Sequence, residues 1–156
     1  MLHISEHIAQ KKAIYEKYKE GLKDLPVTMN PFDSKKVEPN YWLSCIIIDK
    51  DAMCKQVRGE QDALYISEKG KSCPTEILEK ITSINAEGRP IWKPMHMQPI
   101  YRENPFITIK GNGRANSNAY IAGEDIFERG LCLPSDNKMT EEQQDKIIEV
   151  IKECFN

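Results

Sequence analysis

The densest group of side chains that could bind a ligand lies in the segment EGRPIWKPMHMQP, residues 87–99. Two cations in it could hold a phosphate, an indole ring could cover an apolar surface, and an imidazole and an amide could form hydrogen bonds. Three prolines fix much of the backbone and so preorganise these groups. The set suits an anionic ligand that carries a ring, such as a nucleotide or a nucleotide-sugar. The side chains concerned are Arg89, Trp92, Lys93, His96 and Gln98.

Composition alone leaves an alternative open, in which Trp92 belongs to the core and the nearby cations are only solvated. A second candidate is KGNGR, residues 110–114, which could offer backbone N–H groups and two cations to a phosphate. It follows no strong strand and opens no helix, so a surface loop is the simpler interpretation. The chain contains no GxSxG, HExxH, GxxxxGK[ST] or strand-linked GxGxxG signature.

Charge and composition exclude several classes of protein. The chain has 156 residues and a formal net charge of -2, which argues against a general nucleic-acid binder and against a polybasic membrane anchor. No apolar run approaches the roughly 20 residues needed to span a bilayer. The first residues become polar too soon for a secretory signal. The five cysteines are odd in number and form no CxxC pair, so we expect no metal site and reduced, mostly buried thiols in a cytoplasmic protein.

Four segments carry helical patterns that could support such a site. Apolar residues follow one stripe over residues 5–25, and a second helix should begin at Pro74 and stop at Gly88. A third helix is expected over residues 119–129, ending at Gly130. Thr140 and Gln143 have the spacing of a capping box, so the last helix should open there.

Strand patterns are fewer. Residues 41–49 are apolar on both faces and predict a central strand covered on both sides, while RPIWKP and residues 131–133 predict short extended pieces. Residues 26–40 look like a loop, and residues 95–118 look mostly like a loop. The polar excursion over residues 49–72 suggests a short helix near Met53 and a short extended piece at 64–66. We therefore predict a single α+β domain over residues 1–156, with about four helices packed on a three- to four-stranded, mostly antiparallel sheet.

Four segments together resemble the C-terminal part of the DegT/DnrJ/StrS family of pyridoxal-phosphate-dependent sugar aminotransferases. They are RPIWKPMHMQP, the later DIFERGLCLPSDNKMTEEQQDKII, NYWLSCIIID at residues 40–49, and the opening HIAQKKAIYEKYKEGLKDLP at residues 7–26. The resemblance covers most of the chain. Residues 50–72 and 102–118 are the exceptions, and family members are expected to differ in length there.

The resemblance implies that the chain is the small C-terminal domain of a fold-type-I aminotransferase. In that family a large preceding domain carries the lysine that forms the Schiff base, the aspartate that pairs with the pyridine nitrogen, and most contacts to the cofactor phosphate. None of these motifs can be matched here, so no residue of this chain is nominated as catalytic. Pyridoxal phosphate is expected in the full-length parent, but not on this chain alone. The parent is expected to be a homodimer with sites shared between subunits.

The resemblance also ranks the candidate substrate-binding residues. His96 is the strongest candidate by its position in the matched motif, followed by Arg89, Trp92, Lys93 and Gln98. Asn40 and Tyr41 are weaker, because they begin a strand that is mostly core. The implied reaction transfers an amino group from glutamate to a keto nucleotide-sugar, and the chain is not expected to be active alone. The alternative is a stand-alone, non-catalytic binding or dimerisation module, because the chain could bury an adequate core and its last helix is well capped.

Overall fold

The computed structural model describes residues 3–59, 62–108, 111–113 and 120–156. Within these ranges the chain forms four α-helices, α1 (Ile4–Gly21), α2 (Pro74–Ser83), α3 (Ala122–Arg129) and α4 (Glu141–Glu153). The strands are β1 (Val27–Met29), β2 (Ser44–Ile48), β3 (Lys55–Arg58), β4 (Ala63–Ile66), β5 (Arg89–Pro90), β6 (Phe106–Thr108), β7 (Gly111–Gly113) and β8 (Gly130–Leu133). Short 3-10 turns occupy Lys50–Ala52, Met95–Met97 and Pro99–Tyr101.

The main sheet has four strands in the order β1-β2-β8-β5, and every neighbouring pair is antiparallel. Cys45 of β2 lies opposite Cys132 of β8, which in turn faces Arg89 of β5. Two hairpins, β3–β4 and β6–β7, form separate two-stranded sheets. This architecture confirms the predicted α+β class and the predicted antiparallel sheet.

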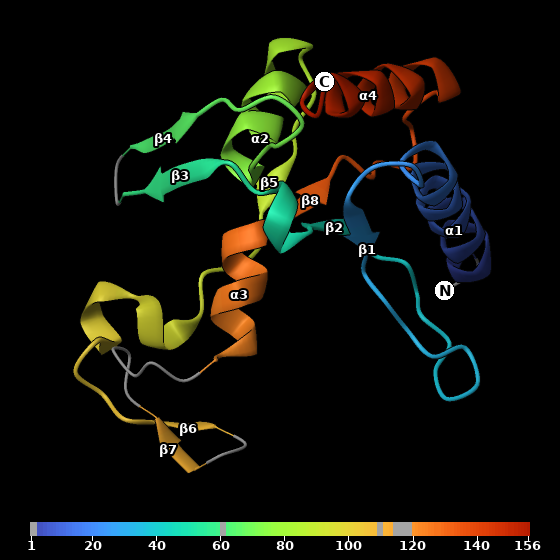
Figure 1. Ribbon diagram of the computed structural model, residues 1–156. Coiled ribbons are helices and arrows are strands. Elements are labelled where there is room, and N and C mark those ends of the chain that lie inside the picture. Colours follow the sequence, from blue (N-terminus) through green and yellow to red (C-terminus); the bar gives the residue numbers. More distant parts are fainter. Residues whose placement is uncertain (1–2, 60–61, 109–110, 114–119) are drawn as a thin grey trace.

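The hydrophobic core lies between this sheet and three of the helices. Tyr18 of α1, Ile77 of α2 and Ile151 of α4 are fully buried against Ile46 of β2 and Leu131 of β8. In contrast, α3 supplies no buried residue. In Figure 1, α3 lies on the far side of the sheet from α4, and the β6–β7 hairpin lies beyond it. The helices α1, α2 and α4 therefore stabilise the fold, and α3 is available to position other groups.

The two faces of β2 are covered unequally. Ile46 and Ile48 are fully buried, whereas Cys45 and Ile47, which point the other way, are half-buried. The predicted central position is confirmed, but only one face of the strand is fully covered. The sheet therefore has a second, partly open face beside α3.

Helices α1 and α2 end earlier than the sequence predicts, and α1 ends at Gly21 instead of residue 25. Helix α2 ends earlier than Gly88, because Asn85 takes the left-handed backbone conformation, with φ of 60°. Gly88 has a different role, since a Cβ there would lie 3.1 Å from the Cys132 carbonyl oxygen. Helix α3 ends at Arg129, as predicted, and Gly130 follows as the extended first residue of β8, with φ of -105°. The capping box at Thr140 and Gln143 is confirmed in both directions.

The segments that lacked a clear pattern contain more structure than expected. Residues 26–40 include β1, which the sequence assigned to a loop. The excursion at 49–72 contains a 3-10 turn at Lys50–Ala52, beside the short helix expected near Met53. It also contains the expected extended piece, β4, and in addition β3, which pairs with β4. Residues 95–118 include β6 and β7, and β7 is the middle of KGNGR, whereas Lys110 and residues 114–119 lie outside the described ranges. Across those ranges, no helix has both the length and the apolar character that a membrane span requires.

Candidate functional site

His96 lies in the turn Met95–Met97, directly after Pro94, and its imidazole is held from two sides. Its Nε2 is 2.7 Å from Oε1 of Glu124, a residue of α3. Its ring stacks on Phe106 of β6, with centroids 4.1 Å apart and planes inclined by 14°. The side chain is 12% exposed, so one edge of the ring remains reachable. This fixed imidazole can present Nδ1 to a ligand.

A cavity of about 340 Å³ opens beside His96. Three cations line it against two carboxylates, and one of those carboxylates, Glu124, is already paired with the imidazole. The cavity therefore has an excess of positive charge, which favours an anionic ligand. Its lining residues are Arg58, Lys93, His96, Met97, Arg102, Glu103, Glu124 and Phe127.

Lys93 and Gln98 reach this region in different ways. Lys93 is half-buried and lines the cavity. The Gln98 amide instead donates to the Lys93 carbonyl oxygen at 3.4 Å, which closes the turn that contains His96. Gln98 thus supports the backbone of the site, and its amide is not directed at a ligand in this arrangement.

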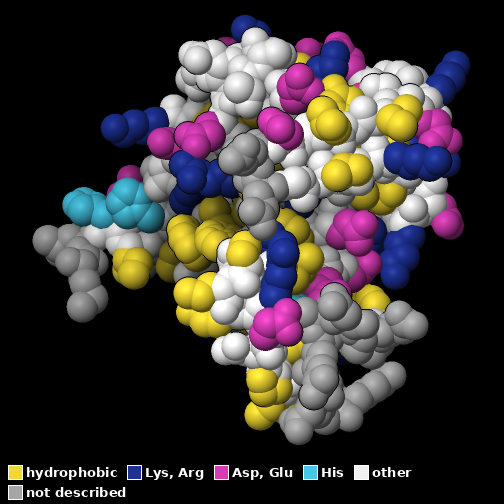
Figure 2. Space-filling view, turned by 90° about the vertical axis from the view of Figure 1, so that its left-hand side faces the viewer, with side chains coloured by type: hydrophobic (Ala, Val, Ile, Leu, Met, Phe, Trp, Pro, Cys, Tyr) yellow, Lys and Arg dark blue, Asp and Glu magenta, His cyan; other side chains and the backbone are white. Residues whose placement is uncertain are grey.

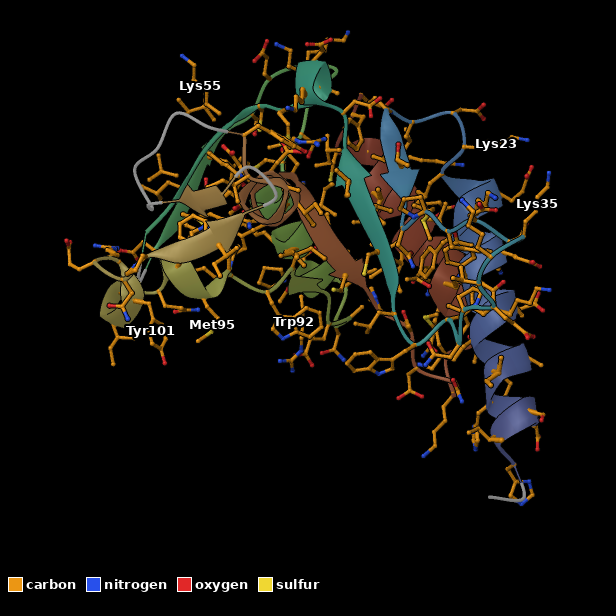
Figure 3. All side chains as sticks on the ribbon, turned by 90° about the horizontal axis from the view of Figure 1, so that it is seen from below. Lys23, Lys35, Lys55, Trp92, Met95 and Tyr101 are labelled. Carbon is orange, nitrogen blue, oxygen red and sulfur yellow. The ribbon has the colours of Figure 1, made fainter. Side chains whose placement is uncertain are left out.

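A second cavity, of about 390 Å³, contains the other two candidates from the same segment. Trp92 is 65% exposed and lies beside Trp42, with ring centroids 6.2 Å apart. Arg89 lines the same cavity, and its guanidinium pairs with Glu87 at 2.6 Å. Figure 3 shows Trp92 projecting from the same side of the molecule as Met95. The alternative in which Trp92 is a core residue is wrong.

Asn40 and Tyr41 belong to neither cavity. The Asn40 side-chain oxygen accepts a hydrogen bond from the Trp42 backbone N–H at 3.1 Å. Tyr41 has a positive φ of 53° and packs its ring against Tyr15 and Phe32, with centroids 5.3 and 5.8 Å away. Both residues shape the turn before β2, and through it they place Trp42 beside Trp92.

The helix that carries Glu124 is fixed to the sheet by its next residue. Asp125 accepts two hydrogen bonds from Arg129, at 2.9 and 2.6 Å, and Arg129 also donates to the Ile48 carbonyl oxygen. The Arg129 hydrogen bonds lower the pKa of Asp125 to about 2, and burial opposes this shift. Further support comes from Lys50, 3.4 Å away. The network holds α3, and therefore Glu124, at a defined position.

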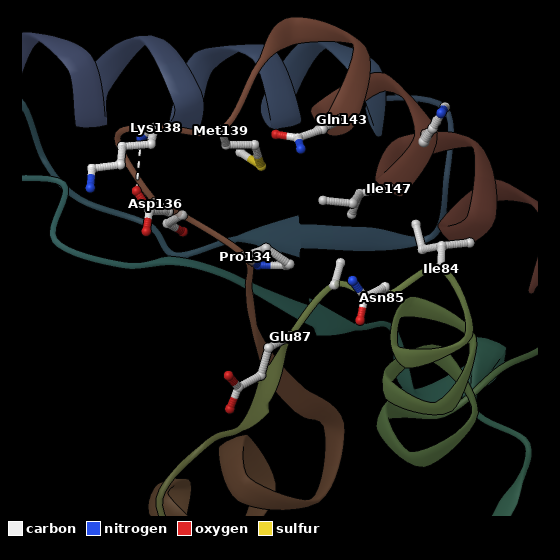
Figure 4. Close-up of a pocket in the computed structure, with 12 residues that line it drawn as sticks. Ile84, Asn85, Glu87, Pro134, Asp136, Lys138, Met139, Gln143 and Ile147 are labelled. Atoms are coloured by element: carbon white, nitrogen blue, oxygen red, sulfur yellow. Dashed lines mark hydrogen bonds between the residues drawn. The ribbon is translucent and has the colours of Figure 1, made fainter.

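Another cavity, of about 640 Å³, lies elsewhere, between the end of α2, the start of α4 and residues 134–139 (Figure 4). Glu87 is the only residue of segment 87–99 that lines this cavity. Asp136 at its rim accepts a hydrogen bond from the Lys138 backbone N–H at 2.7 Å. Because none of the predicted binding residues lines this cavity, we do not assign it to the candidate site.

Several residues of the site were missed by the sequence prediction. Glu124 and Phe106 contact His96, but 28 and 10 residues separate them from it, so no local pattern connects them. Arg58 lies in the excursion that gave no clear pattern. Trp42 follows directly after Tyr41, and the exposure of a large aromatic side chain cannot be read from an apolar run.

The site's donor set does not resemble a metal centre. In the portion of the chain that the structure covers, no three His, Cys, Asp or Glu side chains come together as metal ligands would. The cavity beside His96 instead offers guanidinium and ammonium groups, which suit phosphate or carboxylate.

Comparison with known proteins identifies the family to which the chain belongs. Residues 1–152 match the family model described as the DegT/DnrJ/EryC1/StrS aminotransferase family. EpsN of Bacillus subtilis (strain 168), whose name assigns it as a pyridoxal phosphate-dependent aminotransferase, is 30% identical over 154 residues. That alignment covers 98% of this chain and 32% of EpsN.

Solved structures share the fold at low identity. Helicobacter pylori PseC, an aminotransferase of pseudoaminic acid biosynthesis, is 15% identical with a TM-score of 0.63, covering 95% of this chain and 32% of PseC. DesI, solved in the presence of its TDP-sugar product, is 16% identical with a TM-score of 0.67, covering 97% of this chain and 32% of DesI. The chain thus spans about a third of the length of these relatives, corresponding to their C-terminal part.

Proposed function

Because this chain belongs to the DegT/DnrJ/EryC1/StrS aminotransferase family, we propose that it forms the substrate side of a pyridoxal-phosphate-dependent sugar aminotransferase. The parent enzyme would transfer an amino group, from glutamate, to a keto group on a nucleotide-linked sugar. The observation that carries the proposal is the fixed His96 imidazole at the edge of a cavity with excess positive charge. Such a cavity suits the sugar and the phosphates of a nucleotide-sugar.

Each of the two cavities would bind a different part of the ligand. Nδ1 of His96, in a ring oriented by Glu124 and Phe106, can accept a hydrogen bond from a sugar hydroxyl. Lys93 adds a positive charge beside it. The exposed pair of Trp42 and Trp92 offers flat surfaces on which a nucleobase can stack. Since residues 92 and 93 are consecutive, one ligand can reach both cavities.

The described residues do not supply a complete cofactor site. Pyridoxal phosphate serves as an electron sink, and its chemistry needs a lysine for the imine and a carboxylate opposite the pyridine nitrogen. The cavity beside His96 contains Lys93 but no aspartate. One of its two glutamates, Glu124, is already hydrogen-bonded to His96. These residues therefore do not fit the cofactor by themselves, and we derive no reaction step through it.

Four further features belong to the same proposal. The chain is one small domain over residues 1–156, and a large cofactor-binding domain lies outside it. The parent is a homodimer, and this chain is inactive without the large domain. We also place the parent in the cytoplasm, which fits five cysteines that are all free. The low coverage of the relatives, about a third of each, supports the missing large domain.

The test uses the complete aminotransferase that contains this chain, with glutamate and a keto nucleotide-sugar. We expect His96→Asn to lower kcat/KM by at least about 10-fold, since one lost hydrogen bond to a charged or polar ligand group is worth that much. The absorption spectrum of the bound cofactor should not change. His7→Asn, an exposed change on α1, is the matched control. An unchanged kcat/KM in the His96 variant would refute the site.

The stand-alone alternative is tested by the intact mass of the native protein, captured from its source with an antibody to this domain. A mass about three times that of the chain supports the aminotransferase, because the relatives are about three times as long. A mass equal to that of the 156-residue chain supports a separate binding or dimerisation module.

A further inference from the structure

The hairpin β3–β4 lies in one of the two parts of the chain that the motifs of the family resemblance do not cover. It lies within residues 50–72 and is fixed between two helices by its inward-facing side chains. Gln56 donates to the Glu128 carbonyl oxygen of α3 at 2.6 Å and accepts from the Thr75 hydroxyl of α2 at 3.0 Å. Arg58, two residues along and therefore on the same face, donates from Nη1 to the Phe127 carbonyl oxygen at 2.5 Å.

Arg58 is left with an unmet donor. Its guanidinium lies over the Phe127 ring, 4.9 Å from the centroid, and its Nη2 is buried with no hydrogen-bond partner. Among the described residues, no carboxylate forms a salt bridge with it. Burial lowers the pKa of the Arg58 guanidinium, because charge is costly to remove from water. A buried cation with an unpaired N–H is unfavourable unless another group satisfies it.

The position of this unmet donor indicates what could satisfy it. Arg58 lines the same cavity of about 340 Å³ as His96, together with Lys93 and Arg102. Figure 2 views the side of the molecule that carries the hairpin, and it shows Lys and Arg side chains beside a gathering of hydrophobic ones. The hairpin therefore adds a cation to a cavity that the matched motif lines with His96 and Lys93.

We propose that Arg58 is a phosphate-binding residue, contributed by the β3–β4 hairpin, for the phosphates of the nucleotide-sugar. The proposal rests on the proposed function for the source of the phosphate. A guanidinium presents two N–H groups in one plane, which matches two oxygens of a phosphoryl group. The Phe127 ring and carbonyl hold that plane in place, so little side-chain freedom remains to be lost on binding.

The hairpin itself offers a matched control. Lys55 is exposed and points to the opposite face of β3, three residues before Arg58. In Figure 3 it projects from the other side of the molecule than Trp92 and Met95. Lys55→Gln removes the same charge from the same strand as Arg58→Gln, but not from the cavity.

The experiment titrates the 156-residue chain with inorganic pyrophosphate at low ionic strength, followed by amide and arginine side-chain NMR signals. We expect saturable binding that Arg58→Gln weakens by at least about 5-fold, whereas Lys55→Gln changes it by less than about 2-fold. Arg58→Lys, which keeps the charge but not the planar fork, should be intermediate. In the unaltered chain the Arg58 side-chain signals should shift, and this measurement needs no variant to fold.

Equal losses in the Arg58→Gln and Lys55→Gln variants, or unmoved Arg58 signals at saturation, would overturn the proposal. A parallel titration with uridine diphosphate distinguishes the sources of phosphate. If uridine diphosphate binds more tightly than pyrophosphate, the result supports the phosphates of a nucleotide-linked substrate as the ligand. If the two bind equally, this assignment is overturned in favour of a free phosphate anion. If His96→Asn leaves the complete enzyme unchanged while Arg58→Gln weakens pyrophosphate binding, the proposed function alone has failed.

Discussion

Nε2 of His96 and Oε1 of Glu124 are 2.7 Å apart, although 28 residues separate them in the sequence. Because a carboxylate can only accept, Nε2 must carry the hydrogen, and Nδ1 is left as the free nitrogen. The ring is thus turned with one defined nitrogen toward a ligand. This arrangement depends on α3, which is fixed in turn by Asp125 and Arg129.

The His96–Glu124 contact predicts a single imidazole tautomer. At a pH where the ring is neutral, the ¹⁵N shifts of His96 should show hydrogen on Nε2. In Glu124→Ala the acceptor is lost, so the two tautomers should mix, and the ring-current shift from Phe106 should weaken. Glu128→Ala, also on α3, is the control, because its hydrogen bond to Gln56 is made by the backbone carbonyl and is kept in the variant. Hydrogen on Nδ1 in the unaltered chain would contradict this arrangement.

Three buried cysteines, Cys54, Cys132 and Cys154, should be alkylated at different rates. Cys45 donates a hydrogen bond to Cys132 across β2 and β8, with the sulfur atoms 3.5 Å apart, which lowers the pKa of the Cys132 thiol. Burial raises the pKa of Cys54 to about 12 and that of Cys154 to about 11. All three are less than a tenth exposed, at 4%, 4% and 7%. Since the thiolate is the nucleophile, Cys132 should be alkylated several-fold faster than the other two.

Peptide mapping after timed treatment with iodoacetamide at pH 8 measures these rates. Cys45→Ala removes the donor, so the advantage of Cys132 should disappear while Cys54 and Cys154 keep their rates. If Cys132 in the unaltered chain reacts no faster than Cys54, the hydrogen bond does not control its reactivity.

Two glycine-to-alanine changes should differ in their effect on the free energy of unfolding. A Cβ at Gly88 would lie 2.8 Å from Cδ2 of Leu78 and 3.1 Å from the Cys132 carbonyl oxygen, so one neighbour must move. We expect Gly88→Ala to lower the free energy of unfolding by about 1–3 kcal/mol. At Gly123 in α3 the nearest atom would be Cγ of Pro94 at 3.5 Å, an ordinary contact. Gly123→Ala should be neutral or stabilise by up to about 1 kcal/mol.

Urea titrations with an unchanged m-value would measure both effects. Equal destabilisation by the two changes would show that the packing around Gly88 is looser than described.

Asp125 should contribute stability that is lost in acid. Its pKa falls from 3.8 unfolded to about 2 folded, chiefly through the Arg129 hydrogen bonds. The contribution is therefore present above about pH 4 and is lost as the pH falls from there through about 2. Asp125→Asn should cost roughly 1.5–3 kcal/mol at pH 7, and it should flatten the stability profile between pH 4 and 2.

Asp51→Asn, an exposed change in the 3-10 turn after β2, serves as the reference. Unfolding free energies from pH 2 to 7 make the comparison. The same slope in the Asp125 variant as in the unaltered chain would exclude Asp125 as the source of the acid sensitivity.

The sequence predicted the elements whose patterns are local. The last helix begins at the predicted capping box, because Thr140 and Gln143 lie three residues apart and each satisfies the other's backbone N–H. The central strand followed from its β-branched run, and α2 from Pro74 and its isoleucine stripe. The end of α2 was wrong because Asn85, rather than the more permissive Gly88, took the left-handed position.

The composition of the site was less predictable, because it depends on contacts between distant segments. His96 and Lys93 reach one cavity as expected, but Arg89 and Trp92 face another. Arg58 enters the first cavity only because β3 pairs with β4, and β3 has too weak an alternation to be recognised. Asn40 and Tyr41 have roles in a turn that residue type could not distinguish from ligand binding.

The shortness of β5 limits how this domain can meet another protein. The strand ends the sheet with two residues, and one of them, Pro90, has no backbone N–H. Such an edge cannot be extended by a further strand, and this protects the domain from edge-to-edge aggregation. Association at this edge must therefore use side chains, such as the exposed indoles beside it.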